Sequence, residues 1–233
     1  MLTNTELKSP ILIRIKFEKQ GALRFIGHLD LMRTFQKTFR RADIPIAYSE
    51  GYNPHQIFSI ASPLTLGIGS VGEYLDLKLK ESMDLDDLIS AINNASPEGI
   101  KVTAAVMLEE KAAAGMAAVL GASYTITGKI NDFDLDGLLS KETITVTKKT
   151  KKGKLKEMDI KPGIFGLVHT GDGLVMILSS GSTFNIKPDV VLRELCAFIN
   201  QEYNRFDFQI MRNDIMMGIN PYVNLVGETV TPI

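Results

Sequence analysis

The amino-acid sequence predicts an α+β protein built from two tandem ferredoxin-like domains, each with the element order β-α-β-β-α-β and the second with extra strands. Three observations predict this class. Alternating apolar and polar residues indicate strands, and apolar residues at helical spacing indicate helices. The two kinds of segment follow one another in this order twice, and an alanine-rich segment separates the two series.

The first series begins with ILIRIKF at residues 11–17, where isoleucine and phenylalanine alternate with arginine and lysine, which predicts a half-buried strand. Over residues 28–42, apolar residues recur at helical spacing and basic residues occupy the other side, which predicts an amphipathic helix. Ile44-Pro45 ends this helix because proline lacks a backbone donor. The elements expected after it are a short strand at 46–48, an apolar run at 57–60, a strand at 73–80, a helix at 83–95 capped by Ser82 or Asp84, and a strand at 99–108.

The second series follows a linker over residues 111–122 that we expect to be a short helical connector, so the domains are expected at 1–110 and 123–233. The run KKTKKGKLKE, at residues 148–157, holds six lysines around one glycine and predicts the tip of a β-hairpin. The elements expected in this half are a strand at 123–130, a helix at 133–141, strands across 143–180, a helix at 189–202 and a strand at 206–217.

Composition limits the chemistry of the chain. Its 45% hydrophobic and 23% charged residues are ordinary for a globular protein. The single cysteine, Cys196, lies in a periodic apolar stretch, so we expect it to be buried. One thiol cannot make a disulfide framework, a zinc site of cysteines or the thiolate set of an iron–sulfur cluster, and the three histidines are well apart in sequence. We therefore expect no metal and no cofactor.

Charge and hydropathy limit the partners. With 26 basic and 27 acidic residues the whole molecule is no polycation, so any contact with nucleic acid must come from local patches. No apolar run reaches the roughly 18 residues that a membrane-spanning helix needs. The N-terminus also lacks the layout of a signal peptide. We expect a cytoplasmic protein with no membrane partner.

The stretch RFIGHLDLMR, residues 24–33, places His28 and Asp30 at the start of the first predicted helix. There the backbone N–H groups lack partners and the helix dipole is positive. One interpretation is that Asp30 accepts those donors as a cap, with Gly27 supplying the turn before it. The other is that both residues belong to a binding site, in which the dipole favours a neutral imidazole at His28. The sequence leaves both interpretations open.

A second candidate is SEGYNPHQIFSIASPLTLGIG, residues 49–69, whose glycines and prolines indicate a shaped loop. Such loops commonly present side chains for binding, and the alternative is a connector that crosses the edge of the sheet. The polar side chains that this loop offers are Ser49, Tyr52, Asn53, His55 and Ser59. The sequence contains no phosphate-binding glycine loop between a strand and a helix, no serine-hydrolase elbow and no zinc-protease motif, so those enzyme classes are not expected.

Basic residues form two expected patches, on the outer side of the first helix and in the lysine run. Each patch alone is commonly a solvated face, but together they favour contact with a polyanion, because lysine attracts phosphate as a point charge and arginine makes bidentate contacts. No aromatic RNA-recognition motif is present, so contact is expected with the backbone of RNA or with structured RNA. The expected binding residues are His28, Asp30, Arg33, Lys37, Arg40, Arg41, Ser49, Asn53, His55, Ser59, Lys149, Lys151 and Lys152. No catalytic or metal-binding residue is assigned.

The motifs GHLDL, SEGYNPH and PLTLG occur in this order, and the stretch that holds them resembles the N-terminal signature of a bacterial family of unknown function called radical-SAM-linked proteins. The resemblance spans roughly residues 11–110, and IKPDVVLRELCAF followed by FDFQIMRND resembles the family's C-terminal part. Tyr52 stands where the family usually has phenylalanine, and Gln56 where proline often follows the histidine. Members are encoded beside radical SAM proteins or fused to them, frequently near genes for ribosomal proteins and RNA processing. The resemblance therefore implies a radical SAM partner and RNA, and it brings no established activity.

Three hypotheses follow. The leading one is a non-catalytic RNA- or polyanion-binding partner that presents substrate to a separate radical SAM enzyme, in RNA modification or processing. It requires the GHLD helix start and the YNPH loop to meet at one concave, cation-rich surface. The alternatives are a metal-independent RNA-cleaving or RNA-modifying enzyme that uses His28 or His55 as general acid or base, and a protein-interaction scaffold without nucleic acid.

Overall fold

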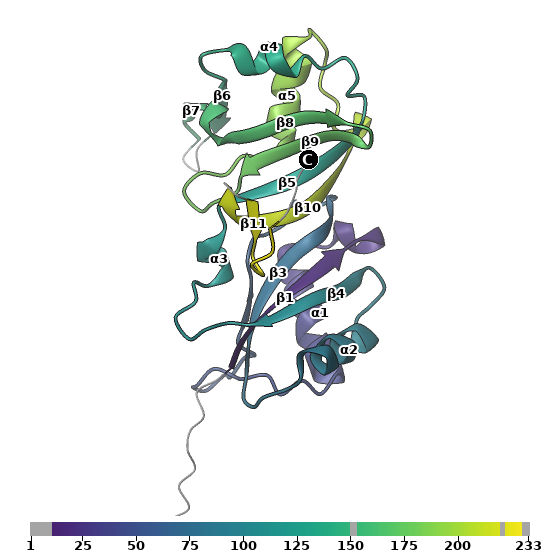
Figure 1. The fold of residues 1–233 in the computed structure, drawn as a ribbon, viewed down its shortest axis with the longest axis vertical. Helices are drawn as coiled ribbons and strands as arrows, with labels where there is room; N and C mark the ends of the chain where they lie inside the picture. Colours follow the sequence, from purple (N-terminus) through teal and green to yellow (C-terminus); the bar gives the residue numbers. More distant parts are fainter. Residues whose placement is uncertain (1–10, 150–152, 220–221, 230–233) are drawn as a thin grey trace, which may run out of the picture. The chain divides into compact units, whose positions relative to one another are not determined.

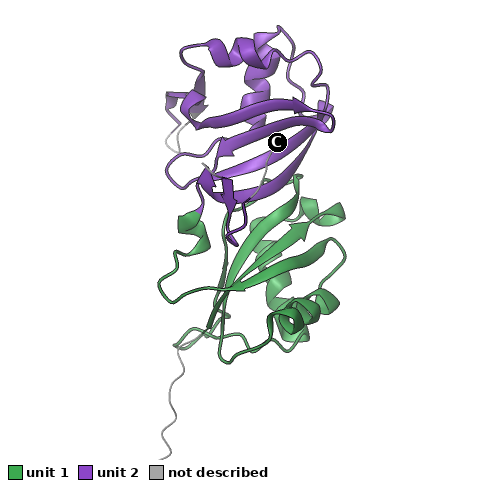
Figure 2. Ribbon diagram, viewed as in Figure 1, with its two compact units in different colours: residues 1–118 green, residues 119–233 purple. Residues whose placement is uncertain are grey.

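The structure is a computed structural model that describes residues 11–149, 153–219 and 222–229, with the side chain of Lys149 left out. The chain divides into two compact units, Met1–Ala118 and Val119–Ile233 (Figure 2). Both units combine helices with a mostly antiparallel sheet, so the predicted α+β class is confirmed. No helix in the described part of the chain is long and apolar enough to cross a membrane.

The first unit contains an antiparallel sheet in the order β4-β1-β3-β2. The chain order of its main elements is strand, helix, strand, strand, helix, strand, as the sequence predicts. The elements are β1 (Ile11–Lys19), η1 (Gly21–Phe25), α1 (His28–Arg41), β2 (Phe58–Ile60), β3 (Gly69–Leu79), α2 (Leu85–Ala95), β4 (Ile100–Met107) and α3 (Gly115–Ala118).

Helices α1 and α2 cover one face of this sheet (Figure 1). The alternation in β1 places Ile13, Ile15 and Phe17 on that face, where they are fully buried with the leucines of β3 and the phenylalanines of α1. The rings of Phe17 and Phe35 meet edge to face, with 4.9 Å between centroids. In β1 and β3, the residues that alternate with these buried ones point to the other face of the sheet. Their side chains therefore cannot join a surface formed by α1.

The second unit contains an antiparallel sheet in the order β10-β5-β9-β8, with β11 added beside β10. Strands β6 and β7 form a separate antiparallel pair, as expected of the lysine-rich hairpin; its tip, residues 150–152, lies outside the described residues. The elements are β5 (Gly121–Gly128), α4 (Leu135–Ser140), β6 (Thr145–Lys149), β7 (Leu155–Asp159), η2 (Lys161–Gly163), β8 (Ile164–Thr170), β9 (Gly173–Ser179), α5 (Pro188–Phe198), η3 (Arg205–Asp207), β10 (Phe208–Ile219) and β11 (Tyr222–Asn224).

Several boundaries differ from the predicted ones for local reasons. The predicted strand at 46–48 is reduced to two isolated bridges, from Ile46 to Leu79 and from Tyr48 to Gln56. Helix α5 ends four residues before the predicted end at 202, and Asn200 adopts a left-handed backbone with φ of 57° that a helix cannot continue through. Asp84, rather than Ser82, caps α2, because its carboxylate accepts the N–H groups of residues 86 and 87. Cys196 is buried, as expected.

Candidate nucleic-acid interface

Helix α1 presents a row of basic side chains to solvent. Its buried residues are Leu31, Phe35, Thr38 and Phe39, which pack toward the sheet. Arg33, Lys37 and Arg40 are spaced by four and three positions, so they lie on one side of the helix, and all three are exposed. We call these three residues the basic stripe. The sequence prediction of a basic outer face is therefore confirmed.

Asp30 does not cap α1. The helix begins at His28, its cap is Gly27, and no side chain accepts a hydrogen bond there. Asp30 is the third helical residue, and its carboxylate instead accepts from Arg33 Nη1 at 2.9 Å. Both side chains of this ion pair are more than half exposed, 61% for Asp30 and 68% for Arg33, so the pair is weak and Arg33 stays accessible to a stronger anion. The capping interpretation is wrong.

Arg41 differs from the stripe although it is also exposed. Its Nε and Nη2 donate to the carbonyl oxygen of Ala95, the last residue of α2, at 3.2 and 2.6 Å, and Nη2 also donates to Thr38 Oγ1. A cation at the C-terminus of a helix satisfies a carbonyl that lacks an intrahelical partner. Arg41 therefore ties α1 to α2, and it is less available to a ligand than the stripe.

Exposed apolar side chains stand at the beginning of α1. Phe25 is 59% exposed, and Leu29 and Leu66 are exposed as well. The Gly67 N–H donates to the carbonyl oxygen of Arg24 at 2.8 Å, which brings the PLTLG loop against η1, and a Cβ at Gly67 would lie 3.8 Å from the Phe25 ring. We call Phe25, Leu29 and Leu66 the apolar patch.

Sequence reasoning missed the apolar patch. Leu29 lies four residues before Arg33, so it falls on the polar side of the helix, where a leucine is out of pattern. This was a detectable signal. The exposure of Phe25 could not be found in this way, because Phe25 precedes the helix in a 3-10 turn and its surroundings include the distant Gly67.

The loop that carries the YNPH motif is held by its own hydrogen bonds. Ser49 and His55 are joined through main-chain atoms at 2.9 Å, and the Ser49 hydroxyl accepts the His55 N–H at 3.1 Å. His55 Nδ1 lies 2.8 Å from the carbonyl oxygen of Asn53. A carbonyl only accepts, so Nδ1 donates, and in the neutral imidazole Nε2 carries the free lone pair. The side chains of Asn53 and His55 are exposed, whereas Ser49 serves the loop itself.

The YNPH loop meets α1 at the middle of the helix. Gln56 Nε2, at the base of the loop, donates to the carbonyl oxygen of Gln36 at 3.4 Å. Gln36 lies eight residues after His28, which is about 12 Å along the helix axis. Among the described residues, no hydrogen bond or ion pair joins His28 or Asp30 to residues 49–55. That the two motifs share one ligand stays a prediction.

The remaining predicted site residues lie elsewhere. Ser59 stands opposite Asp76 in the pairing of β2 with β3, so it points to the sheet face that α1 does not cover. Lys149 is the last residue of β6 in the second unit, and Lys151 and Lys152 lie outside the described residues. The structure therefore gathers Arg33, Lys37 and Arg40 on α1 and does not bring Ser59 to them.

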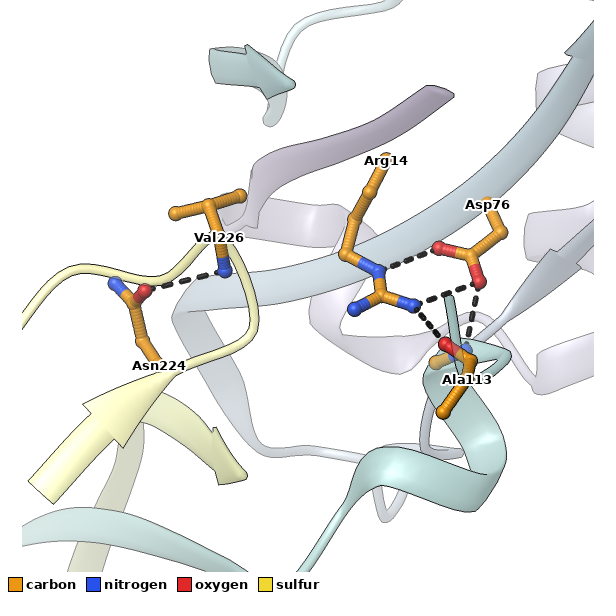
Figure 3. Close-up of polar contacts among 6 residues, drawn as sticks. Arg14, Asp76, Ala113, Asn224 and Val226 are labelled. Atoms are coloured by element: carbon orange, nitrogen blue, oxygen red, sulfur yellow. Dashed lines mark hydrogen bonds and ion pairs between the residues drawn. The ribbon is translucent and has the colours of Figure 1, made fainter. Parts of the chain in front are cut away.

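A buried polar cluster occupies the face of the first sheet that Ser59 shares. Arg14 and Asp76 are directly opposite in β1 and β3, and their ion pair has Nε to Oδ1 at 2.6 Å and Nη2 to Oδ2 at 3.0 Å (Figure 3). Asp76 also accepts the Gly115 N–H at 2.7 Å, and Arg14 donates to the carbonyl oxygen of Ala113 at 2.9 Å. The cluster thus fastens the segment before α3 to the sheet. Its carboxylate is already engaged, which makes it a structural group rather than a general base.

A second polar cluster supports a turn in the other unit. The Asn224 side-chain oxygen accepts the N–H groups of Val226 and Glu228 at 3.1 and 2.9 Å, and the first of these bonds is drawn in Figure 3. Asn224 Nδ2 donates to Glu228 Oε2 at 2.8 Å. An asparagine that bonds the backbone two and four residues ahead holds a turn in place.

Over 11–149, 153–219 and 222–229, histidine, cysteine and carboxylate side chains form no group of three that could hold a metal ion.

Comparison with known proteins places this chain in a family. A model of the family described as "Uncharacterized protein conserved in bacteria (DUF2344)" matches residues 12–188, which is most of the chain. The matched span includes α1, the YNPH loop and the PLTLG loop. A comparison with curated proteins gave no match.

Proposed function

This chain belongs to the DUF2344 family of bacterial proteins, and we propose that it is a non-catalytic module that binds RNA or a similar polyanion and presents it to a separate radical SAM enzyme, in RNA modification or processing. The observation that carries the proposal is the basic stripe. Arg33, Lys37 and Arg40 project from one side of α1, and over seven positions they cover about 10 Å along its axis.

The arrangement suits phosphate better than an isolated carboxylate. A phosphate backbone repeats its charge along its length, so a row of cations gains from each successive contact and releases counterions. Near His28, moreover, α1 begins without a side-chain cap, which leaves its first N–H groups and the positive end of the helix dipole available to an anion. The formal net charge of the chain is only −1, so this local concentration of cations decides where a polyanion binds.

A separate radical SAM enzyme is proposed because of the motif resemblance and the thiol content. The chain has one cysteine, Cys196, which is buried in α5, whereas an iron–sulfur cluster requires several thiolates. The redox chemistry would therefore belong to the partner. We propose that the two proteins meet in the cytoplasm, where RNA is present.

The two units are proposed to be tandem ferredoxin-like domains. The sheet orders support this, since β4-β1-β3-β2 and β10-β5-β9-β8 both place the first and third strands at the centre. In each unit one helix follows the first strand and another follows the third. The second unit has the pair β6 and β7 inserted before its second sheet strand, and β11 at the end.

The experiment is RNA binding measured by fluorescence anisotropy over a range of salt concentrations. Arg33→Ala combined with Arg40→Ala is expected to weaken binding and to reduce the slope of log affinity against log salt by about 1.4 for single-stranded RNA, because each lost phosphate contact contributes about 0.7. The matched control replaces Lys101 and Lys187, two exposed lysines outside α1, with alanine and should leave the slope unchanged. Equal salt dependence of the stripe variant and the wild type would overturn the proposal.

Two other outcomes identify the alternatives. Turnover of RNA by the purified chain alone, lost in His55→Ala, would replace the proposal with a catalytic function. Recovery of the same partner protein with the wild type and the stripe variant, without RNA, would favour a protein scaffold. Each result contradicts the proposal on a separate measurement.

A further inference from the structure

The apolar patch at the beginning of α1 exposes apolar side chains, and the anion binding proposed for the basic stripe gives no reason for them. Phe25 leaves more than half of its surface in water, and Leu29 lies at the head of the same helix side that carries the stripe. A single exposed apolar side chain is ordinary, whereas apolar side chains that are exposed together mark a contact surface. The question is which partner combines a flat apolar group with negative charge.

The surroundings of the Phe25 ring answer it. The Arg24 guanidinium carbon lies over the ring, 4.7 Å from its centroid, and therefore covers one face. Gly67 adjoins the ring at its Cε1 edge, and its φ of +83° favours glycine at this position. Phe25 is thus a largely exposed ring beside a cation, and the basic stripe follows along the helix that begins three residues later.

We infer that Phe25 is a stacking platform for one unpaired base of a single-stranded RNA segment, with the flanking phosphates on Arg24 and the basic stripe. The inference rests on the proposed function and adds the substrate class to it. Unstacked RNA bases stack on aromatic side chains, and this contact accepts any base because every base has a π face. A duplex keeps its bases paired and stacked, so it can use the stripe but not the ring.

The charge pattern favours nucleic acid over an apolar peptide. Leu29, Arg33, Lys37 and Arg40 follow one another along one side of α1, so a ligand with its flat group at Phe25 meets cations at every following turn. In RNA each base is followed by a phosphate, which matches this order. Tyr52, fully exposed in the YNPH loop, offers a second ring of the same kind, but the inference does not depend on it.

The test compares two forms of one RNA on a set of matched variants. The probes are an oligoribonucleotide that carries a fluorescent purine analogue, whose emission falls on stacking, and the same oligonucleotide annealed to its complement. The variants are Phe25→Leu, which keeps an apolar side chain without a ring, and Phe25→Tyr, which keeps the ring. Phe206→Leu is the control, because Phe206 is 94% exposed in the second unit and lies outside the patch.

For single-stranded RNA we expect Phe25→Leu to weaken binding by about 5- to 150-fold, the range observed when a stacking aromatic is removed, and to abolish the loss of emission. Phe25→Tyr and Phe206→Leu should bind as the wild type does, and duplex binding should be the same for all four proteins. These results together would support the platform.

Results that contradict the stacking platform can be distinguished from results that contradict the proposed RNA-binding function. If Phe25→Leu binds single strands like the wild type while the Arg33 and Arg40 variant loses affinity, the platform is overturned and the polyanion-binding function stands. If Phe25→Leu leaves RNA binding intact but removes a co-purifying protein, the patch is a protein-docking surface and the inference is likewise overturned. If the wild type does not bind RNA at low salt, both proposals are overturned.

Discussion

Substitution Asp76→Ala removes the acceptor of the buried cluster that Arg14 shares with the segment before α3. The side chains of Arg14 and Asp76 are 3% and 7% exposed, and the carboxylate accepts from Arg14 Nε, from Arg14 Nη2 and from the Gly115 N–H. After the substitution, these donors no longer have the carboxylate as an acceptor, and burial keeps water from replacing it freely. Removing one partner of a buried ion pair costs about 3–5 kcal/mol of unfolding free energy.

The structure provides a control with the same chemistry at a different depth. Asp30 and Arg33 form an ion pair of 2.9 Å, close to the 2.6 Å of the buried pair, but both side chains are mostly exposed. Asp30→Ala should therefore cost no more than about 1 kcal/mol, because water solvates the arginine that remains. The two substitutions remove the same functional group from one unit of the same protein and differ chiefly in burial.

The measurement is equilibrium unfolding in urea followed by circular dichroism, with thermal unfolding beside it. A loss of 3–5 kcal/mol corresponds to a decrease of about 6–20 °C in Tm for a chain of this size. Asp76→Asn keeps an acceptor of similar shape and should fall between Asp76→Ala and the wild type. If Asp76→Ala and Asp30→Ala destabilise the protein equally, burial does not determine the strength of this pair and the reasoning is refuted.

Three further predictions concern the second unit. Gly128→Ala should destabilise the protein by more than about 1 kcal/mol in urea unfolding, because Gly128 has a φ of +120° and a Cβ would lie 2.0 Å from the Asp207 carbonyl oxygen; an unchanged midpoint would contradict this. Burial and the hydrogen bond to Asp189 raise the pKa of Tyr203 above its ordinary value of about 10, so the folded state keeps a proton that the unfolded chain releases. Stability should be complete below pH about 10 and fall as the pH rises further, and Tyr203→Phe should remove that part of a urea-derived pH profile. Cys196 is buried, so a thiol reagent at neutral pH should label it only as fast as the protein opens, and burial also raises the pKa of the thiol; rapid labelling of the native protein would show the thiol to be accessible.

Much of the fold could be predicted because its signals are local. The alternation in β1 and the helical spacing in α1 reflect burial on one side of each element. Asp84 could be identified as a possible cap because it is an aspartate directly before the first residue of α2. The sequence predicts a short helical connector here, but the bounds of α3, Gly115–Ala118, could not be predicted from alanine content. The segment before it is held by contacts with residues 14 and 76, far away in sequence, so a long-range ion pair overrides the local helix propensity.

The candidate site was predictable to the same extent. The spacing of Arg33, Lys37 and Arg40 indicated a shared helix side, which the structure confirms. Asp30 was open to misinterpretation because an acidic residue in the first turn suits both a cap and an ion pair, and only the position of the helix start separates the two. The exposure of Phe25 depends on how η1 and the distant Gly67 pack, which no local pattern encodes.

The bond from Arg41 to the end of α2 has a consequence for experiments that vary the charges of α1. Since the guanidinium donates through Nε and Nη2 to the final carbonyl of the neighbouring helix, Arg41 joins the end of α1 to the end of α2. Replacing Arg41 would remove both of these bonds and so alter how the two helix ends are joined, apart from any effect of the lost charge. Charge-scanning experiments that replace position 41 together with the stripe would confuse that structural role with affinity, so Arg41 is best varied alone.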